Sequence, residues 1–302
     1  MYTTLNDPNA NGYTYPVSIN SSGAVIGNYK DASGNSHGFL YSNGTYTNLD
    51  DPNSNNSFGT NPTQINDSGQ IVGYYNDTTG FLYSNGTYTT ISDPNANSGL
   101  TYSRAINNSG EIVGSYNANG SEFEFMYNAG TYTNFNPPNA YGPAGGSLVI
   151  PGGINSSGQI AGQYLDSSDQ SHGFFYDGTS FKTLDDPSAS PGQGGTDAWK
   201  INSTGQITGT FQDSFGYMIA FSYANGTYTT INDPLSIGAD GGSNVTWMND
   251  SGTVVGSYHT SGGVINGYIA TIATGSAPEP PSVVLVGLLT GCLAIRRKQK
   301  RN

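Results

Sequence analysis

The sequence has few charged residues, and basic residues are the scarcest of them. Only 10% of the 302 residues are charged, with 9 Lys and Arg against 21 Asp and Glu, and the formal net charge is −12. Such a balance argues against a nucleic-acid-binding protein, because an acidic surface repels phosphate. The same composition argues against a helical bundle, which needs abundant Leu, Ala, Glu and Lys.

Cysteine and histidine are almost absent. The single cysteine, Cys292, excludes an intramolecular disulfide and a cysteine-based zinc site. Three histidines leave little room for a metalloenzyme. Aromatic residues, in contrast, make up 12% of the chain, which is too much burial capacity for a disordered protein.

An internal repeat dominates the first 270 residues. Residues 65–75 (Ile-Asn-Asp-Ser-Gly-Gln-Ile-Val-Gly-Tyr-Tyr) recur with small changes in six copies, spaced by 46, 41, 48, 47 and 47 residues. A second element follows, as in residues 37–49, and it ends in an apolar residue shortly before an Asx-Pro step. The repeated asparagines are Asn20, Asn66, Asn107, Asn155, Asn202 and Asn249.

The repeat has the pattern of short antiparallel strands. Apolar and aromatic residues alternate over four to seven positions between Gly, Asn, Asp and Ser. Asn-Gly, as at Asn43-Gly44, predicts a tight hairpin. The second glycine of each copy, such as Gly73, falls inside a strand, and we expect it to allow close approach of a neighbouring sheet. Four strands every 40 to 50 residues are typical of a β-propeller blade, whereas a β-solenoid, the second choice, would use shorter coils.

The two ends of the repeat region complement each other. Residues 2–8 match residues 88–94, which end a repeat, whereas the sixth repeat lacks a fourth strand. The sequence therefore predicts an all-β, six-bladed β-propeller of four-stranded antiparallel blades over residues 1–275, with the ring closed by the N-terminal strand. The Asn turns should lie on one face of the disc. The longer, variable loops should lie on the other, where binding is usual.

The repeat stops after Gly275. Residues 276–282 form a Pro-rich linker, and residues 283–302 combine a hydrophobic segment with a basic tail. We expect a short hydrophobic helix there, whose apolar run over 283–295 is too short to span a bilayer comfortably. Its basic cluster would stay on the cytoplasmic side of a membrane.

This tail resembles the PEP-CTERM sorting signal of Gram-negative bacteria. The resemblance rests on Pro278-Glu279-Pro280, the apolar segment and a terminal basic cluster that includes Arg296, Arg297 and Lys298. It implies processing by exosortase, a membrane protease-transferase, after transient anchoring in the inner membrane. It also implies export to the cell surface or the extracellular matrix, in association with polysaccharide. Residues 1–5 lack the basic and apolar regions of an export signal, so we expect the true start to lie upstream.

The repeats resemble the HAF-type extracellular repeat proteins. Those proteins carry a His-Ala-Phe step before an aromatic-rich strand, and His37-Gly38-Phe39 and His172-Gly173-Phe174 are the closest versions here. The resemblance covers nearly all of residues 1–272 and brings no established activity with it. Because the two histidines occupy equivalent positions, they are interpreted as strand-edge packing residues.

Aspartates before proline are the first candidate site. Oxygen-rich loops suit Ca²⁺, but Asx before proline is also a common turn initiator that needs no metal. Asp7 and Asn136 occupy equivalent positions, and Asp50 and Asp185 add second carboxylates. The candidate cation or ligand residues are Asp51, Asp93, Asp186 and Asp233.

The two tryptophans, Trp199 and Trp247, are the second candidate site. They could form an aromatic platform for a glycan, or they could fill gaps between blades. A catalytic pair is harder to identify, because most acids recur in every repeat. Glu111, Glu122 and Glu124 do not recur, but Glu111 falls in a turn position that is expected to be exposed. No Gly-x-Ser-x-Gly nucleophile motif precedes a helix.

The sequence thus favours a non-catalytic, exported repeat protein that presents loops for binding, with polysaccharide as the candidate partner. The alternative is a propeller-type polysaccharide hydrolase or lyase. The two hypotheses differ in one respect. An enzyme should gather non-repeated carboxylates in one cleft, whereas a scaffold should distribute its acids with the repeat.

Overall fold

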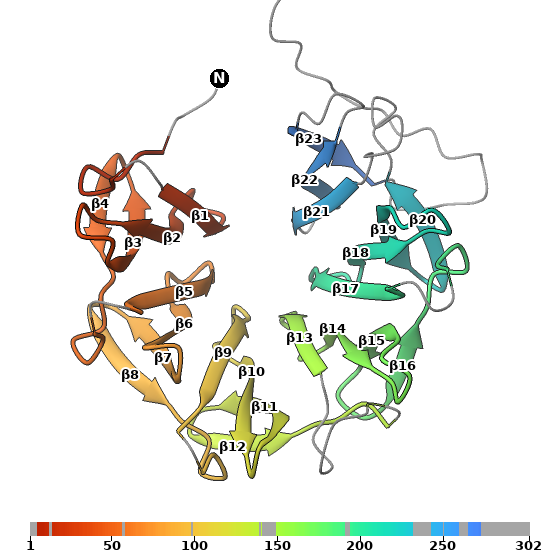
Figure 1. Ribbon diagram of the computed structural model, residues 1–302, viewed down its shortest axis with the longest axis horizontal. Helices are drawn as coiled ribbons and strands as arrows, with labels where there is room; N and C mark the ends of the chain where they lie inside the picture. The colour runs from red at the N-terminus through yellow and green to blue at the C-terminus, as the bar shows by residue number, and fades with distance from the viewer. Residues whose placement is uncertain are drawn as a thin grey trace, which may run out of the picture.

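The computed structural model arranges six antiparallel sheets one after another around a central axis (Figure 1). It describes residues 5–11, 14–55, 58–97, 99–138, 140, 149–190, 194–231, 243–249, 251–259 and 265–272. Five sheets have four strands and the sixth has three, always in sequence order. The predicted six-bladed propeller is confirmed. No helix occurs among the described residues, so none there is long and apolar enough to cross a membrane.

Blades 1 to 3 come from the first half of the chain. The first strand of each blade lies nearest the ring axis, and each later strand lies further out (Figure 1). Their strands are β1 (Thr14–Ile19), β2 (Val25–Lys30), β3 (Ser36–Ser42), β4 (Thr45–Asn48), β5 (Thr60–Ile65), β6 (Ile71–Tyr75), β7 (Thr79–Ser84), β8 (Thr87–Ile91), β9 (Thr101–Ile106), β10 (Ile112–Ala118), β11 (Ser121–Asn128) and β12 (Thr131–Asn134).

Blades 4 to 6 repeat this arrangement. Inner strands of consecutive blades contact each other from β1 to β21, so the axis is walled by first strands. The remaining strands are β13 (Val149–Ile154), β14 (Ile160–Leu165), β15 (Ser171–Tyr176), β16 (Phe181–Leu184), β17 (Thr196–Ile201), β18 (Ile207–Gln212), β19 (Met218–Ala224), β20 (Thr227–Ile231), β21 (Ser243–Met248), β22 (Thr253–His259) and β23 (Ile265–Thr271).

Every inner strand carries a β-bulge at the same place. The pairing of β1 with β2 shifts between Pro16 and Ser18, and the other five inner strands shift at the equivalent position. A bulge inserts one unpaired residue and redirects neighbouring side chains. The bulged position holds five different residue types in six blades, and its residues are Val17, Thr63, Arg104, Gly152, Trp199 and Thr246.

The strand glycines serve packing within a blade, which corrects the expectation of contact with a neighbouring sheet. Gly73 pairs with Phe81 across β6 and β7, and the fully buried Phe81 ring lies over it. An added Cβ on Gly73 would overlap the carbonyl oxygen of Asn61 in the same blade and lie 2.9 Å from the Phe81 ring. The same pairing joins Gly27 with Phe39, Gly114 with Phe125, Gly162 with Phe174 and Gly209 with Phe221.

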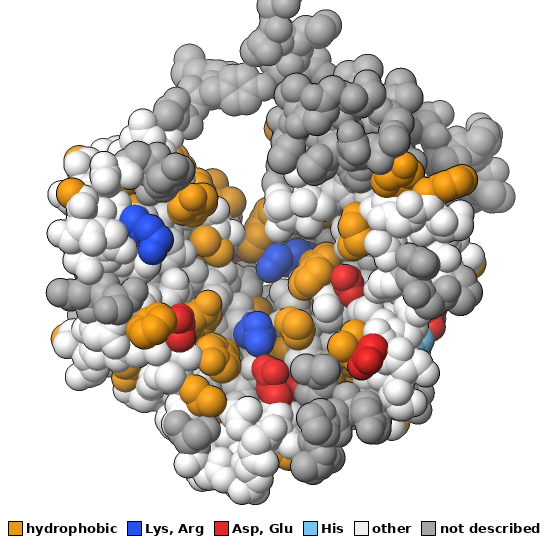
Figure 2. All heavy atoms as spheres, viewed as in Figure 1, with side chains coloured by type: hydrophobic (Ala, Val, Ile, Leu, Met, Phe, Trp, Pro, Cys, Tyr) orange, Lys and Arg blue, Asp and Glu red, His pale blue; other side chains and the backbone are white. Residues whose placement is uncertain are grey.

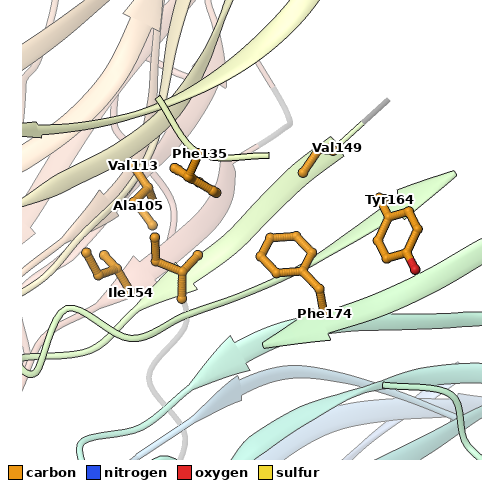
Figure 3. Packing of buried hydrophobic residues seen from close by; sticks show 8 residues of the cluster. Ala105, Val113, Phe135, Val149, Ile154, Tyr164 and Phe174 are labelled. Atoms are coloured by element: carbon orange, nitrogen blue, oxygen red, sulfur yellow. The ribbon is translucent and has the colours of Figure 1, made fainter. Parts of the chain in front are cut away.

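The hydrophobic core lies between blades rather than in one central mass. Between blades 3 and 4, Ala105 and Val113 face Val149, Ile154 and Phe174 of the next blade (Figure 3). Most of the buried clusters likewise join two consecutive blades. Removing this apolar surface from water at each junction stabilises the stacking of separate sheets into a ring.

The predicted ring closure and tail fall largely outside the described residues. The sixth sheet has three strands in the described part, as expected, and the proposed closing strand begins in residues 1–4, which are not described. Leu5 packs against Val25, Tyr29 and Phe39 of blade 1, much as Leu49 packs against blade 2. The linker and tail, residues 276–302 with the predicted helix, also lie outside the described residues.

Candidate functional site

The repeated asparagines connect the blades at the axis. In each turn the Asn side-chain oxygen accepts backbone N–H groups of its own turn, as Asn155 does from Ser157 (3.0 Å) and Gln159 (3.1 Å). Its amide nitrogen donates to the backbone oxygen of the asparagine in the next blade. These contacts run Asn20 to Asn66 (3.1 Å), Asn66 to Asn107 (2.9 Å), Asn107 to Asn155 (2.9 Å), Asn155 to Asn202 (3.1 Å) and Asn202 to Asn249 (3.3 Å).

In blades 2 to 5 the residue four positions after the asparagine supports this chain of amides. Gln70, Gln159 and Gln206 accept a hydrogen bond from the asparagine of their own turn, and Glu111 accepts from Asn107 at 2.7 Å. Glu111 is therefore only partly exposed and has a structural partner, which corrects its interpretation as a residue in an exposed turn position. Sequence reasoning assigned the asparagines to turns alone, because their second partner lies a whole repeat away.

A cavity of about 550 Å³ lies on the axis at the asparagine turns. Its wall is formed by the ends of the six inner strands and by turn amides and hydroxyls. In the axial view, Lys or Arg and Asp or Glu side chains gather around the middle of the disc, while much of the rim is uncharged (Figure 2). The lining of the cavity includes the side chains of Asp67, Lys200, Trp247 and Met248.

The structure separates the two predicted platform tryptophans. Trp247 on β21 lines the cavity, and the Lys200 ammonium lies 5.5 Å from the centroid of its indole ring. Trp199 occupies a bulge on β17, does not line the cavity, and directs its ring N–H to Thr210 Oγ1 at 3.3 Å. Only Trp247 is placed where a ligand in this cavity could stack on it.

Lys200 was missed by the sequence reasoning. Its ammonium donates to the backbone oxygen of Gly152 at 3.2 Å, and burial lowers the pKa of this ammonium to about 8. The signal that could have found it is its alignment within the repeat. Lys200 and Trp247 both stand two residues before a repeated asparagine. The residue type at this position varies between repeats. In four blades the position lines the cavity, and its residues there are Gln64, Gly153, Lys200 and Trp247.

The predicted Asp-Pro sites are turn structures. Asp51, 2% exposed, donates its N–H to Thr60 Oγ1 at 2.8 Å and accepts the N–H of Asn53 at 2.8 Å. Asp7, Asp93 and Asp186 repeat these contacts in separate blades. The described residues contain no group of three or more His, Cys, Asp or Glu placed to hold a metal ion, and Asp233 lies outside them. Calcium at these positions stays a prediction.

Asn136 replaces aspartate in blade 3 for an electrostatic reason. Blade 3 has the fully buried Glu124 where blades 1, 2 and 4 have glycine. With the Asn136 amide turned so that its nitrogen faces the acceptors around it, this nitrogen donates to Glu124 Oε2 at 2.6 Å. A second carboxylate at position 136 would repel the first in this buried place. Blade 3 therefore departs from the repeat at two neighbouring positions, with Asn136 in place of aspartate and Glu124 in place of glycine.

The two HAF-like histidines each bridge two carboxylates. His37 Nδ1 lies 2.6 Å from Asp50 and its Nε2 lies 3.4 Å from Asp31, while the ring stacks on Tyr29. Burial opposes the charged ring, but the hydrogen bonds and charge of Asp50, then of Asp31, raise the pKa of His37. Instead of simple strand-edge packing, the ring ties the loop after β2 to the exit of β4.

Blade 4 carries the same arrangement around His172. Its Nδ1 lies 2.8 Å from Asp185, its Nε2 lies 3.3 Å from Asp166, and its ring stacks on Tyr164. These residues line a second, open cavity of about 620 Å³ at the edge of blade 4. Asp50 and Asp185, noted in the sequence as second carboxylates, are therefore histidine partners.

The non-repeated glutamates do not meet in one cleft. Glu111 contacts Asn107, Glu122 pairs with Arg104 at 3.3 Å, and Glu124 bonds Asn136. None of the three lines the axial cavity, where Asp67 is the only carboxylate among the described residues. Glycoside hydrolysis ordinarily needs two carboxyl groups on either side of the scissile bond.

Comparison with known proteins places the fold. No protein-family model and no curated protein sequence matches the chain. The β-propeller domain of the Trilobed protease from Pyrococcus furiosus, with an open velcro topology, is similar at 11% identity and a TM-score of 0.55, covering 84% of this chain and 78% of that one. A lectin from Aleuria aurantia in complex with Fucα1-6GlcNAc gives 14% identity, a TM-score of 0.46, and coverage of 87% and 93%. AofleA from Arthrobotrys oligospora gives 13% identity and a TM-score of 0.47, covering 91% of this chain and 87% of that one. At 11% identity the likeness to the Trilobed protease domain is one of fold alone, and that fold is a β-propeller.

Proposed function

We propose that the chain is a non-catalytic carbohydrate-binding propeller that takes part of a glycan into its axial cavity. The observation that carries this proposal is Trp247, an aromatic ring on the wall of a cavity otherwise rich in amide and hydroxyl groups. A sugar presents an apolar C–H face, which suits an aromatic ring, and hydroxyl groups, which suit amides. The Aleuria aurantia neighbour is named as a sugar-binding lectin, but that likeness is too remote to locate a site.

The alternative, a polysaccharide hydrolase or lyase, has no comparable support. A hydrolytic pair would have to be found among carboxylates that already serve structural contacts, and Asp67 stands without a second carboxylate in the lining among the described residues. Binding without turnover is therefore the better reading of the axial cavity.

Replacing Trp247 with alanine is expected to weaken glycan binding by about tenfold or more. The reason is the loss of stacking area in a partly enclosed place, and tenfold corresponds to about 1.4 kcal/mol. The measurement is binding of the full chain to an array of bacterial polysaccharide fragments, followed by titration calorimetry with the best of them.

Trp199→Ala is the matched control, because it removes the same side chain from outside the cavity. Both variants should first show unfolding curves close to the parent. Equal losses in the two variants, or no glycan bound by the parent chain, would overturn the proposal.

We further propose export to the cell surface with sorting by exosortase, supported by Pro278-Glu279-Pro280 and the basic residues from Arg296 onward. Attachment there would hold the propeller beside extracellular polysaccharide. The expected mature protein lacks residues 283–302. Intact-mass measurement on surface-extracted protein tests this, and a mass that retains those residues would contradict it.

A further inference from the structure

Lys200, the basic residue that lines the axial cavity, differs from the other basic residues of the propeller. Residues 1–275 contain only Lys30, Arg104, Lys182 and Lys200 as basic residues. Arg104 pairs with Glu122, Lys30 lies exposed beside Ser36 Oγ at 3.2 Å, and Lys182 contacts the Tyr223 hydroxyl. Of the four, only Lys200 lines the axial cavity.

Lys200 has no carboxylate within 4.0 Å among the described residues. Its ammonium can donate three hydrogen bonds, and the contact with Gly152 O uses one of them. Burial lowers its pKa to about 8, because the surrounding protein disfavours the charged form. A charge in that condition is stabilised by any anion that reaches it.

The neighbouring strand fixes where this ammonium lies. An added Cβ on Gly152 would overlap the carbonyl oxygen of Trp199 and lie 2.9 Å from its Cα, so the backbones of β13 and β17 pack directly on each other. Lys200 can therefore reach across to Gly152 O. On its other side stands the Trp247 ring, 5.5 Å from the ammonium to the ring centroid.

Asp67, the one carboxylate in the described lining, does not compete for this charge. It lies on the turn of blade 2, three blades away around the ring from Lys200 in blade 5. Its carboxylate accepts the Ser21 N–H and the Asn108 amide, each at 2.8 Å, and the Ser21 hydrogen bond is the main reason for its lowered pKa. These two hydrogen bonds already stabilise the negative charge of Asp67.

We propose that the axial cavity selects an acidic sugar, a uronic-acid residue whose carboxylate accepts hydrogen bonds from Lys200 while its ring stacks on Trp247. This inference rests on the proposed glycan-binding function and names the class of sugar. A charged ligand also explains why one of the few basic residues of a strongly acidic protein is placed where no carboxylate of the described residues pairs with it.

The test compares acidic oligosaccharides with the same molecules after reduction of their carboxylates to primary alcohols. Oligogalacturonate and oligomannuronate are suitable probes, titrated calorimetrically into the full chain. The parent is expected to bind at least one acidic form about tenfold or more tightly than its reduced form, because a charge-assisted hydrogen bond is lost on reduction. Raising the salt concentration should weaken only the acidic form.

Lys200→Gln is expected to remove this preference, lowering the affinity for the acidic form about tenfold more than the affinity for the reduced form. Lys30→Gln is the control, because it removes the same charge from an exposed position outside the cavity. The comparison of acidic and reduced ligands on the parent chain does not depend on any variant folding.

The outcomes separate the two proposals. If reduced oligosaccharides bind as well as acidic ones and Trp247→Ala abolishes both, glycan binding stands and acid selection is wrong. An unchanged preference in Lys200→Gln also overturns acid selection. If no glycan of either kind binds, both proposals fail together.

Discussion

Gly209→Ala should lower the free energy of unfolding by about 3 kcal/mol or more. The added Cβ would overlap the carbonyl oxygen of Asp197 in the same blade and lie 2.9 Å from the Phe221 ring. Overpacking in a core costs about 1–3 kcal/mol, and more where the obstructing atom is backbone that cannot rotate away. Phe221 is fully buried against Gly209, so β17, β18 and β19 would all have to shift.

Gly86→Ala is the control for this substitution. Gly86 lies in an exposed hairpin turn with φ of 82° and no heavy atom within 4 Å of an added Cβ. Only backbone strain opposes alanine there, so the loss should be about 1 kcal/mol. Urea unfolding of both variants measures the difference. Equal losses would mean that the crowding over Gly209 does not matter.

Asn155→Ala should cost about 3 kcal/mol for a different reason. The substitution removes the donor to Asn202 O (3.1 Å) and the acceptor of the Ser157 and Gln159 N–H groups. Asn155 is 5% exposed, and each buried polar group left without a partner costs about 1–3 kcal/mol. The substitution damages its own turn and the contact between blades 4 and 5 at once.

The matched control is Asn128→Ala, at an exposed position whose side-chain amide donates to Glu111 Oε1 at 3.0 Å. Its loss should be within about 0.5 kcal/mol. The same urea titration applies to both. A loss below about 1 kcal/mol for Asn155→Ala would show that water replaces the missing amide, and the asparagine chain would then not hold the blades together.

The hairpin turns marked by Asn-Gly were predictable from the sequence. Asn43-Gly44 indicates a hairpin turn because both residues accept positive φ, and the structure has 51° and 82° there. The period of the repeat then gave four strands per blade and six blades. These features depend on residues close together in the chain, which one sequence displays directly.

Contacts between repeats were not predictable in the same way. The sequence marks Asn66 as important, but its second partner, Asn107 O, is 41 residues away and becomes its neighbour only in the ring. For Gly73 the sequence indicated close packing against a neighbouring sheet, whereas the structure has the Phe81 ring of the same blade there. Lys200 and Trp247 stand 47 residues apart, and only the bulged inner strands bring them to one cavity.

The five asparagine hydrogen bonds between blades run in one direction, each of blades 1 to 5 donating to the blade that follows it. Such a contact is heterologous: two different surfaces meet, as they do between subunits of a cyclic oligomer. A heterologous contact produces a closed ring only if its rotation, repeated a whole number of times, completes a turn, and otherwise it produces a spiral. Blade number is therefore a property of the angle built into one repeat, so that a chain with one copy added or deleted would have to change that angle at every asparagine.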